Sequence, residues 1–257
     1  MKPKSHNYAT VQEWDAKRTK ELSKMFSPYI ALTDSYAELV CEITDVLGTH
    51  QPNSVQDTVI RDLLADVFDA LHEARRIIMT GKCSVAYPVA RRVYESLSLL
   101  VLCILDSRFA TKWHSRGKIS NGDVRRELAK HPLGETQEST KELHDFFCLG
   151  THPNRDLIPG RGLGEGNQFT LGAVIKPSLA LVTEYCMIHL RMWFWFTAVL
   201  LHRHHLLVVA AKPDIGNRYL SVARSAQNLQ TELECHWKRL LREEQSQHNA
   251  TGNARIS

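Results

Sequence analysis

The sequence of 257 residues lacks an uncharged apolar run that is long enough to cross a membrane. Its run MWFWFTAVLL, Met192–Leu201, has ten residues between Arg191 and His202, whereas a spanning helix needs about 20. The N-terminal residues, MKPKSHNYATVQEWDAK, lack the apolar core of a signal peptide. We therefore expect the apolar runs to form buried helices of a cytoplasmic protein that makes no contact with a membrane.

Cysteine pairs with metal-binding spacing are also missing. The six cysteines are spread along the chain without a Cys-x-x-Cys pair; they are Cys41, Cys83, Cys103, Cys148, Cys186 and Cys235. This spacing does not fit a zinc ribbon or a disulfide framework. Free thiols buried in a reducing compartment are the expected state.

The alternating pattern of a half-buried strand is nearly absent, and helical spacing dominates instead. Residues 55–80 carry apolar side chains at the spacing of one helix face: Val59, Leu63, Val67, Leu71 and Ile78. With an apolar share of 43%, the chain can bury a substantial core. The sequence therefore predicts an all-α fold, a helical bundle with long core helices.

Glycines and caps set the expected helix ends, with Gly48 as a stop and Ser54 with Asp57 as a capping pair. We expect helices over about Val11–Met25, Tyr29–Leu47, Val55–Thr80, Ser84–His114, Gly122–Lys130, Gln137–Leu149, Pro177–His205 and Arg218–Glu244, and one short strand over Phe169–Val174. The expected division is N-terminal helices (1–53), a helical core (54–211), a C-terminal amphipathic helix (212–246) and a disordered tail (247–257).

The charges are unevenly spread. Met25–Glu73 contains nine acidic residues and one basic residue, whereas Ala74–Lys118 contains nine basic and two acidic residues. Two interpretations remain open. Neighbouring helices with complementary faces explain the pattern, and so does a basic face that meets phosphate.

Two further patterns have weak functional meaning. GRGLGEG, Gly160–Gly166, follows neither the phosphate-binding loop nor the dinucleotide-binding pattern. It fits a lid with Arg155 and Arg161 as phosphate contacts, or a plain loop. His202 and His205 share one helix face without an obvious third ligand, so we expect neither a metal ion nor another cofactor.

The segment ARRVYES contains a charged pair at the edge of an apolar run. Arg91 and Glu95 are four residues apart and therefore share one face of a helix, while Arg92 points about a quarter turn away. A structural ion pair explains this spacing. Alternatively, the arginine orients an anion and the glutamate fixes its geometry.

Ala86–Trp113, together with FFCLGTHPN at Phe146–Asn154, resembles a family of bacterial helical proteins of unknown function. In that family an Arg-x-x-x-Glu helix leads into an apolar run, and a second helix ends in a His-Pro turn. Its organisation is similar to that of HEPN-like domains. That group includes metal-independent RNA-cleaving toxins and nucleotide-binding proteins that do not cleave.

The resemblance implies a site made by Arg91, Glu95 and His152, with Asn154 beside the histidine. We expect Arg92, Asn154, Arg155 and Arg161 to be substrate contacts around this site. Histidine suits the base that activates a 2′-hydroxyl, because its pKa lies near neutrality. Arginine suits the phosphate, because its planar fork matches the phosphate oxygens. Alternatively, His152 only caps a helix end. Arg-x4–6-His pairs, the cleavage signature of the wider group, occur here only as often as chance predicts.

We therefore expect a cytoplasmic HEPN-like dimer that binds or cleaves RNA, of the toxin or phage-defence type. The alternative is a non-catalytic helical module that binds a protein or a nucleotide. Its partner surface would be an apolar stripe on the last helix: Leu229, Leu233, Trp237 and Leu240. The same stripe could equally pack onto its own bundle.

Overall fold

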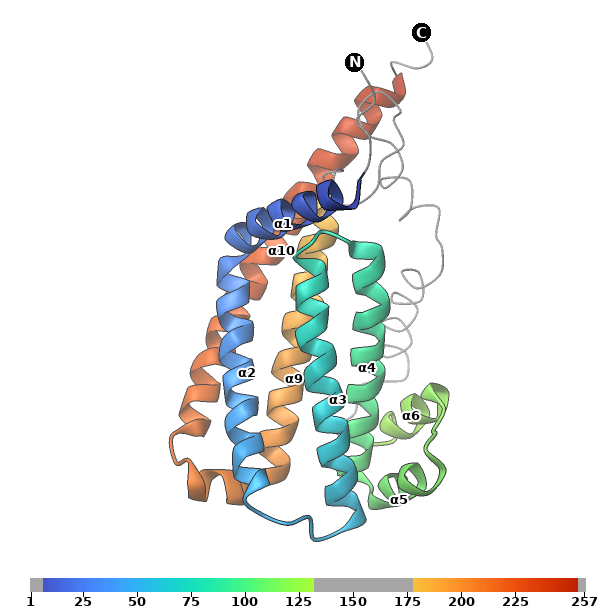
Figure 1. The fold of residues 1–257 in the computed structure, drawn as a ribbon, viewed down its shortest axis with the longest axis vertical. Helices are drawn as coiled ribbons and strands as arrows, with labels where there is room; N and C mark the ends of the chain where they lie inside the picture. Colours follow the sequence, from blue (N-terminus) through green and yellow to red (C-terminus); the bar gives the residue numbers. More distant parts are fainter. Residues whose placement is uncertain (1–6, 132–177, 254–257) are drawn as a thin grey trace.

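The computed structural model describes residues 7–131 and 178–253, and within these ranges all regular structure is helical (Figure 1). The eight helices described are α1 (Tyr8–Met25), α2 (Ser27–Gly48), α3 (Val55–Ile78), α4 (Cys83–Leu105), α5 (Ser107–Arg116), α6 (Asn121–Leu128), α9 (Leu179–Ala211) and α10 (Ile215–Asn253). The predicted all-α bundle with long helices is confirmed. The predicted helix 137–149 and the predicted strand 169–174 lie outside the described residues.

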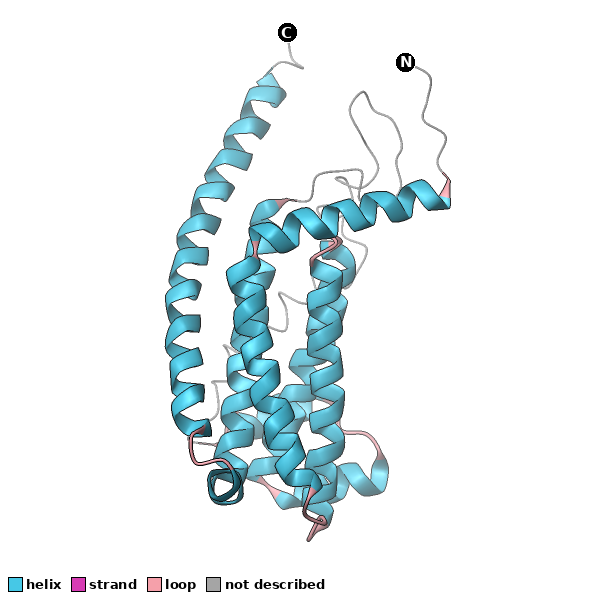
Figure 2. Ribbon diagram, turned by 60° about the vertical axis from the view of Figure 1, so that its left-hand side comes forward, coloured by secondary structure: helices cyan, strands magenta, loops and turns pink. Residues whose placement is uncertain are grey.

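Long helices run side by side, and α9 packs against α2, α3, α4 and α10. Helix α1 lies across one end of this bundle, and α10 runs past that end (Figures 1 and 2). Near the other end, α5 and α6 pack on α4. Helix α2 shares one hydrophobic core with α3, α4 and α9. The division into segments at residues 53 and 211 stays a prediction.

One expected helix is two helices. We predicted continuous helix over Ser84–His114, but α4 ends at Leu105 and α5 begins at Ser107. Between them Asp106 has an extended backbone, and its carboxylate accepts a hydrogen bond from the Arg108 N–H at 2.9 Å. An aspartate that caps a helix competes with the helix before it, and this explains the break.

The last two helices are longer than predicted. Helix α9 continues past His205 to Ala211, with non-helical angles at His204 (φ −111°, ψ 19°). Helix α10 continues to Asn253, which is seven residues into the predicted disordered tail. No proline, and no glycine before Gly252, interrupts the sequence after Glu244, so no breaker ends the helix there.

The predicted capping pair and most predicted buried thiols are confirmed. The Ser54 hydroxyl accepts a hydrogen bond from the Asp57 N–H at 3.1 Å. Three described cysteines are buried, Cys83, Cys103 and Cys186, and two are exposed, Cys41 and Cys235. Burial raises the pKa of Cys103 to about 12, so this thiol is inert at neutral pH.

The apolar stripe of α10 packs inward. Leu229 and Leu233 belong to the hydrophobic core, and Trp237 packs against it. Leu240 is buried as well. The structure therefore supports the interpretation that this stripe packs onto its own bundle.

Helix α9 is the one described helix that is long and apolar enough to cross a membrane. A core helix of a soluble protein passes the same test, so this is weak evidence either way. The cytoplasmic location stays a prediction.

A buried histidine joins three helices at the centre of the bundle. His189 of α9 is fully buried. Its Nδ1 lies 2.6 Å from the hydroxyl of Tyr29 on α2, and its Nε2 lies 2.9 Å from the carbonyl oxygen of Leu71 on α3. A neutral ring satisfies both contacts when Nε2–H donates to the carbonyl and Nδ1 accepts from the tyrosine. Burial lowers the pKa of His189 to about 4 and keeps the ring neutral.

Replacing Tyr29 by phenylalanine should lower the free energy of unfolding by about 1–3 kcal/mol, because the buried Nδ1 of His189 loses its donor. Urea unfolding at pH 7 measures the loss. Tyr8→Phe is the matched control, since Tyr8 is 76% exposed and should change stability very little. Equal stability of Tyr29→Phe and the wild type would contradict this account of the core.

Stability should also fall as the solution is acidified from pH 6.5 to pH 5. The folded state lowers the pKa of both His189 and His204 to about 4, chiefly through burial, so only the unfolded chain takes up these protons in that range. Each group should then contribute a slope of about 1.4 kcal/mol per pH unit. Urea unfolding across this range should give a shallower slope for His204→Gln. A flat profile for the wild type would refute the buried neutral state.

Candidate functional site

Three polar side chains form a ridge along α4. Tyr87, Arg91 and Glu95 follow one another at four-residue steps and therefore lie on one side of the helix. The Nε–H of Arg91 donates to Oε1 of Glu95 at 2.8 Å. The two side chains are 27% and 23% exposed, so the pair is neither fully solvated nor buried. The predicted pairing of Arg91 with Glu95 is confirmed.

A fourth polar group reaches this ridge from α9. The Tyr87 hydroxyl donates to Oε2 of Glu184 at 3.3 Å. The Tyr87 ring meets the Tyr185 ring edge to face at 5.7 Å, which fixes its direction. We call Tyr87, Arg91, Glu95 and Glu184 the seam cluster, because they lie where α4 meets α9.

Burial raises the pKa of Glu184 above its ordinary range, and the hydrogen bond from Tyr87 offsets only part of this effect. The carboxyl group therefore holds a proton more readily than an exposed glutamate does. A half-buried carboxyl group with a raised pKa, in contact with a tyrosine that lies one helix turn from an arginine, is a candidate proton donor or acceptor. The seam cluster thus combines a fixed cation with a group that can exchange a proton.

Arg92 lies outside the seam cluster. It forms an ion pair with Asp66 of α3. The same carboxylate accepts a hydrogen bond from the Ser96 hydroxyl at 2.8 Å. The expected quarter turn between Arg91 and Arg92 is therefore confirmed, and Arg92 faces α3. Its role as a substrate contact stays a prediction.

Four other predicted site residues lie outside the described residues: His152, Asn154, Arg155 and Arg161. A shared pocket of Arg91 and His152 therefore stays a prediction. Sequence reasoning assigned no functional role to Glu184. A single acidic residue in the apolar stretch LALVTEYCMIHL was the available signal, because such a residue is rarely buried without a partner.

Ion pairs between the two segments explain part of the charge pattern. Arg75 of α3 pairs with Asp34 of α2, and Arg92 of α4 pairs with Asp66 of α3. Arg76 pairs with Glu73 within α3. The interpretation as neighbouring helices with complementary faces is confirmed for this part of the bundle.

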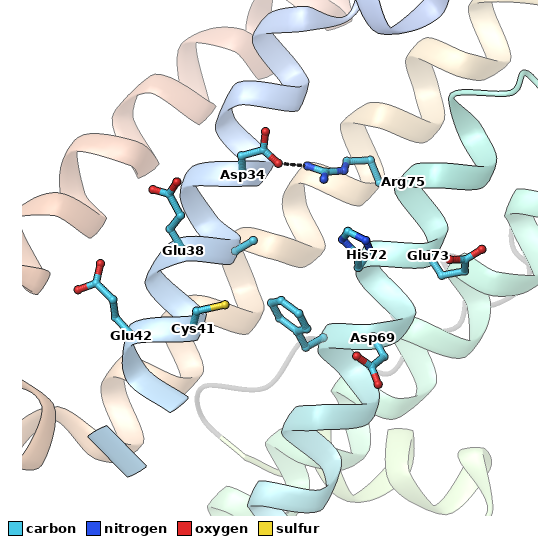
Figure 3. A pocket seen from close by; sticks show the side chains of 10 residues that line it. Asp34, Glu38, Cys41, Glu42, Asp69, His72, Glu73 and Arg75 are labelled. Carbon is cyan, nitrogen blue, oxygen red and sulfur yellow. Dashed lines mark hydrogen bonds and ion pairs between the residues drawn. The ribbon is translucent and has the colours of Figure 1, made fainter. Parts of the chain in front are cut away.

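An acidic groove lies between α2 and α3, with a volume of about 870 Å³ (Figure 3). Most of the polar side chains that line it are acidic: Asp34, Glu38, Glu42, Asp69 and Glu73, with Cys41, His72 and Arg75 beside them. The Asp34–Arg75 ion pair bridges the two helices. Partial burial, and then the charges of Asp45 and Glu38, raise the pKa of the Cys41 thiol. Asp34, Glu42 and Glu73 form ion pairs with arginines, so among the described residues Glu38 and Asp69 supply the groove's unpaired negative charge.

Neither this groove nor the histidine-rich end of α9 forms a metal site. In residues 7–131 and 178–253, no three histidine, cysteine or acidic side chains gather as a set that could hold a metal ion. His202 and His205 are both exposed, on either side of the distortion at His204. They fit the polar helix end that the sequence also allowed.

Comparison of the chain with models of protein families, with curated proteins and with solved structures finds no match.

Removing the charge of Glu184 should reveal its raised pKa. Glu184→Gln should be more stable than the wild type at neutral pH, where the wild-type carboxyl must be charged in a half-buried place. The difference should shrink as the pH falls toward 4, because both forms are then neutral. Urea unfolding at several pH values tests this. Glu232→Gln, which removes an exposed carboxylate of α10, should show no such trend; a Glu184→Gln variant that is less stable at neutral pH would contradict the assignment.

Proposed function

We propose that the protein binds RNA at the seam cluster and cleaves it without a metal ion, as HEPN-like ribonucleases do. The observation that carries the proposal is the seam cluster itself. An arginine held by Glu95 stands one helix turn from a tyrosine that contacts a carboxyl group of raised pKa. This combination fits a phosphodiester and a proton transfer better than it fits a purely structural ion pair.

The proposed cleavage has three parts. His152 takes the proton of the 2′-hydroxyl, and the 2′-oxygen attacks the adjacent phosphorus. The guanidinium of Arg91 offsets the charge that builds up on the phosphate oxygens. The bond to the 5′-oxygen breaks and this oxygen takes a proton from Glu184, which leaves a 2′,3′-cyclic phosphate and a free 5′-hydroxyl.

Each described residue has a separate reason for its role. Glu95 accepts the Nε–H of Arg91 and thereby orients the guanidinium. Tyr87 contacts Glu184 and holds its carboxyl group beside the ridge. The raised pKa of Glu184 suits a proton donor, because at any given pH its carboxyl group is protonated in a larger fraction of molecules than an ordinary glutamate is.

Incubation of total cellular RNA with the protein in EDTA tests the proposal. The wild type should cut, and His152→Ala and Glu184→Gln should each lose about 10²–10⁴-fold in rate, which is the usual contribution of a positioned acid or base. Arg91→Gln should lose about 10²-fold or more. The product ends should be a 2′,3′-cyclic phosphate and a 5′-hydroxyl.

Arg224→Gln is the matched control for Arg91→Gln, because Arg224 is exposed on α10. It should cut like the wild type. If folded wild-type protein neither cuts RNA nor retains it at low salt, the proposal is wrong. The chain would then be better described as a non-catalytic helical module.

A further inference from the structure

The hairpin formed by α5 and α6 carries far more basic than acidic residues. Residues 107–131 contain seven lysine and arginine residues and two acidic residues. Three buried side chains attach the hairpin to the bundle: Ala110, Val124 and Leu128. Its position is therefore fixed, although most of its surface is exposed.

Local contacts fix the turn of this hairpin. Gly117 ends α5 in the left-handed conformation (φ 64°), and its N–H donates to the Trp113 carbonyl at 2.7 Å. Ser120 then caps α6, because its hydroxyl accepts from the Asp123 N–H at 3.1 Å. Arg116 and Lys118 therefore flank the tip of a defined turn.

The two arms of the hairpin lie close enough for their charges to interact. The pKa of Asp123 on α6 is lowered, first by the hydrogen bond with Ser120 and then by the charges of Arg126 and of Lys112 on α5. The pKa of Arg108 is raised, chiefly by its hydrogen bond with Asp106 and further by the charge of Glu127 on α6. Charged side chains of α5 therefore lie near charged side chains of α6.

Carboxylates neutralise only some of these basic groups. Arg108 pairs with Asp106, Arg126 with Asp123, and Lys130 with Glu127. The other four, which we call the hairpin cations, form no ion pair with any described residue: Lys112, Arg116, Lys118 and Arg125. Lys112 lies instead over the ring of Phe109, at 5.7 Å.

We propose that the hairpin cations bind the phosphate backbone of RNA and hold the strand on which the seam cluster acts. This inference rests on the proposed function and extends it to a second surface. Four cations on a fixed hairpin, none of which forms an ion pair with a described residue, match a chain of regularly spaced phosphates. In the groove between α2 and α3, Glu38 and Asp69 carry charge without an ion pair among the described residues, so that groove disfavours the same strand.

The surface of the hairpin argues against two other anionic partners. The large apolar side chains that the described chain exposes all lie elsewhere: Tyr8, Met25, Val55, Val85, Phe194, Leu206 and Leu220. The large apolar side chains Phe109, Trp113 and Ile119 of the hairpin are partly buried against the core, so none of them projects as the fully exposed anchor that insertion into an anionic membrane or a protein interface needs.

Helix α4 connects the two surfaces. Arg91 lies fourteen residues before Leu105, where α4 ends and the hairpin begins. This separation corresponds to about 21 Å along the helix axis. A strand that reaches both surfaces must therefore contain several nucleotides, and a mononucleotide cannot replace it.

The test is the salt dependence of RNA binding by the full chain. One variant combines Lys112→Gln, Arg116→Gln, Lys118→Gln and Arg125→Gln. The matched control combines Lys17→Gln, Lys20→Gln, Arg224→Gln and Arg242→Gln, which removes the same charges from exposed positions on α1 and α10. Fluorescence anisotropy with a single-stranded RNA of about 20 nucleotides gives the affinity at each salt concentration.

For the hairpin variant, the slope of log affinity against log salt should become shallower by about 3, since each lost phosphate contact removes about 0.7. The control should keep the wild-type slope. If the fourfold variant does not fold, the pair Arg116→Gln and Lys118→Gln at the exposed tip should give about half of this change. Urea unfolding verifies that the proteins compared are folded.

The other outcomes overturn the inference in distinguishable ways. Wild-type binding that the hairpin variant retains would place the RNA elsewhere and leave the proposed function standing. Equal losses in the hairpin variant and the control would show a general charge effect. A wild type that binds no RNA would overturn both proposals, even if it bound vesicles containing phosphatidylserine.

Discussion

The arrangement of three helices depends on the two buried hydrogen bonds of the neutral His189 imidazole. These bonds join α9 to α2 through the Tyr29 hydroxyl and to α3 through the Leu71 carbonyl. Because both contacts are short and buried, α9 cannot rotate about its axis without leaving a polar group unsatisfied. Glu184 lies five residues earlier, which places it about 140° around the same helix. The histidine that faces α2 and α3 thus turns the glutamate toward α4, where it accepts a hydrogen bond from Tyr87.

Basic residues in the segment 74–118 serve two physical purposes. Arg75 on α3 and Arg92 on α4 pair with carboxylates of the acidic segment, Asp34 and Asp66. Such pairs add little stability where they are exposed, but they disfavour other arrangements of the helices. The cations near the tip of the α5–α6 hairpin have no such partners among the described residues. The interpretation as complementary faces therefore holds for the pairs between α2, α3 and α4, and the interpretation as a phosphate-binding face stays a proposal for the hairpin.

Local interactions could be predicted from the sequence, and distant ones could not. The face of α3, the cap at Ser54 and the Arg91–Glu95 pair depend on residues at most a few helix turns apart, and the structure confirms them. The contact of Tyr87 with Glu184 joins positions 97 residues apart, so no spacing rule reveals it. The break at Asp106 was missed for another reason. The apolar run before it continued the helical pattern, and the capping preference of aspartate outweighed that pattern.

The positions of the charged surfaces also restrict how an anionic chain can approach. Salt screens the electrostatic attraction of the hairpin cations beyond about 10 Å at ordinary ionic strength. This range is shorter than the axial distance from Leu105 to Arg91. Attraction by the hairpin therefore cannot by itself deliver a phosphate to Arg91. A polymer can bridge that distance, because each phosphate bound at the hairpin raises the effective concentration of the next along α4. A small phosphate ester gains nothing from the hairpin. If the hairpin cations bind phosphate as we propose, this geometry selects by length and favours a polynucleotide over its monomers before any base is recognised.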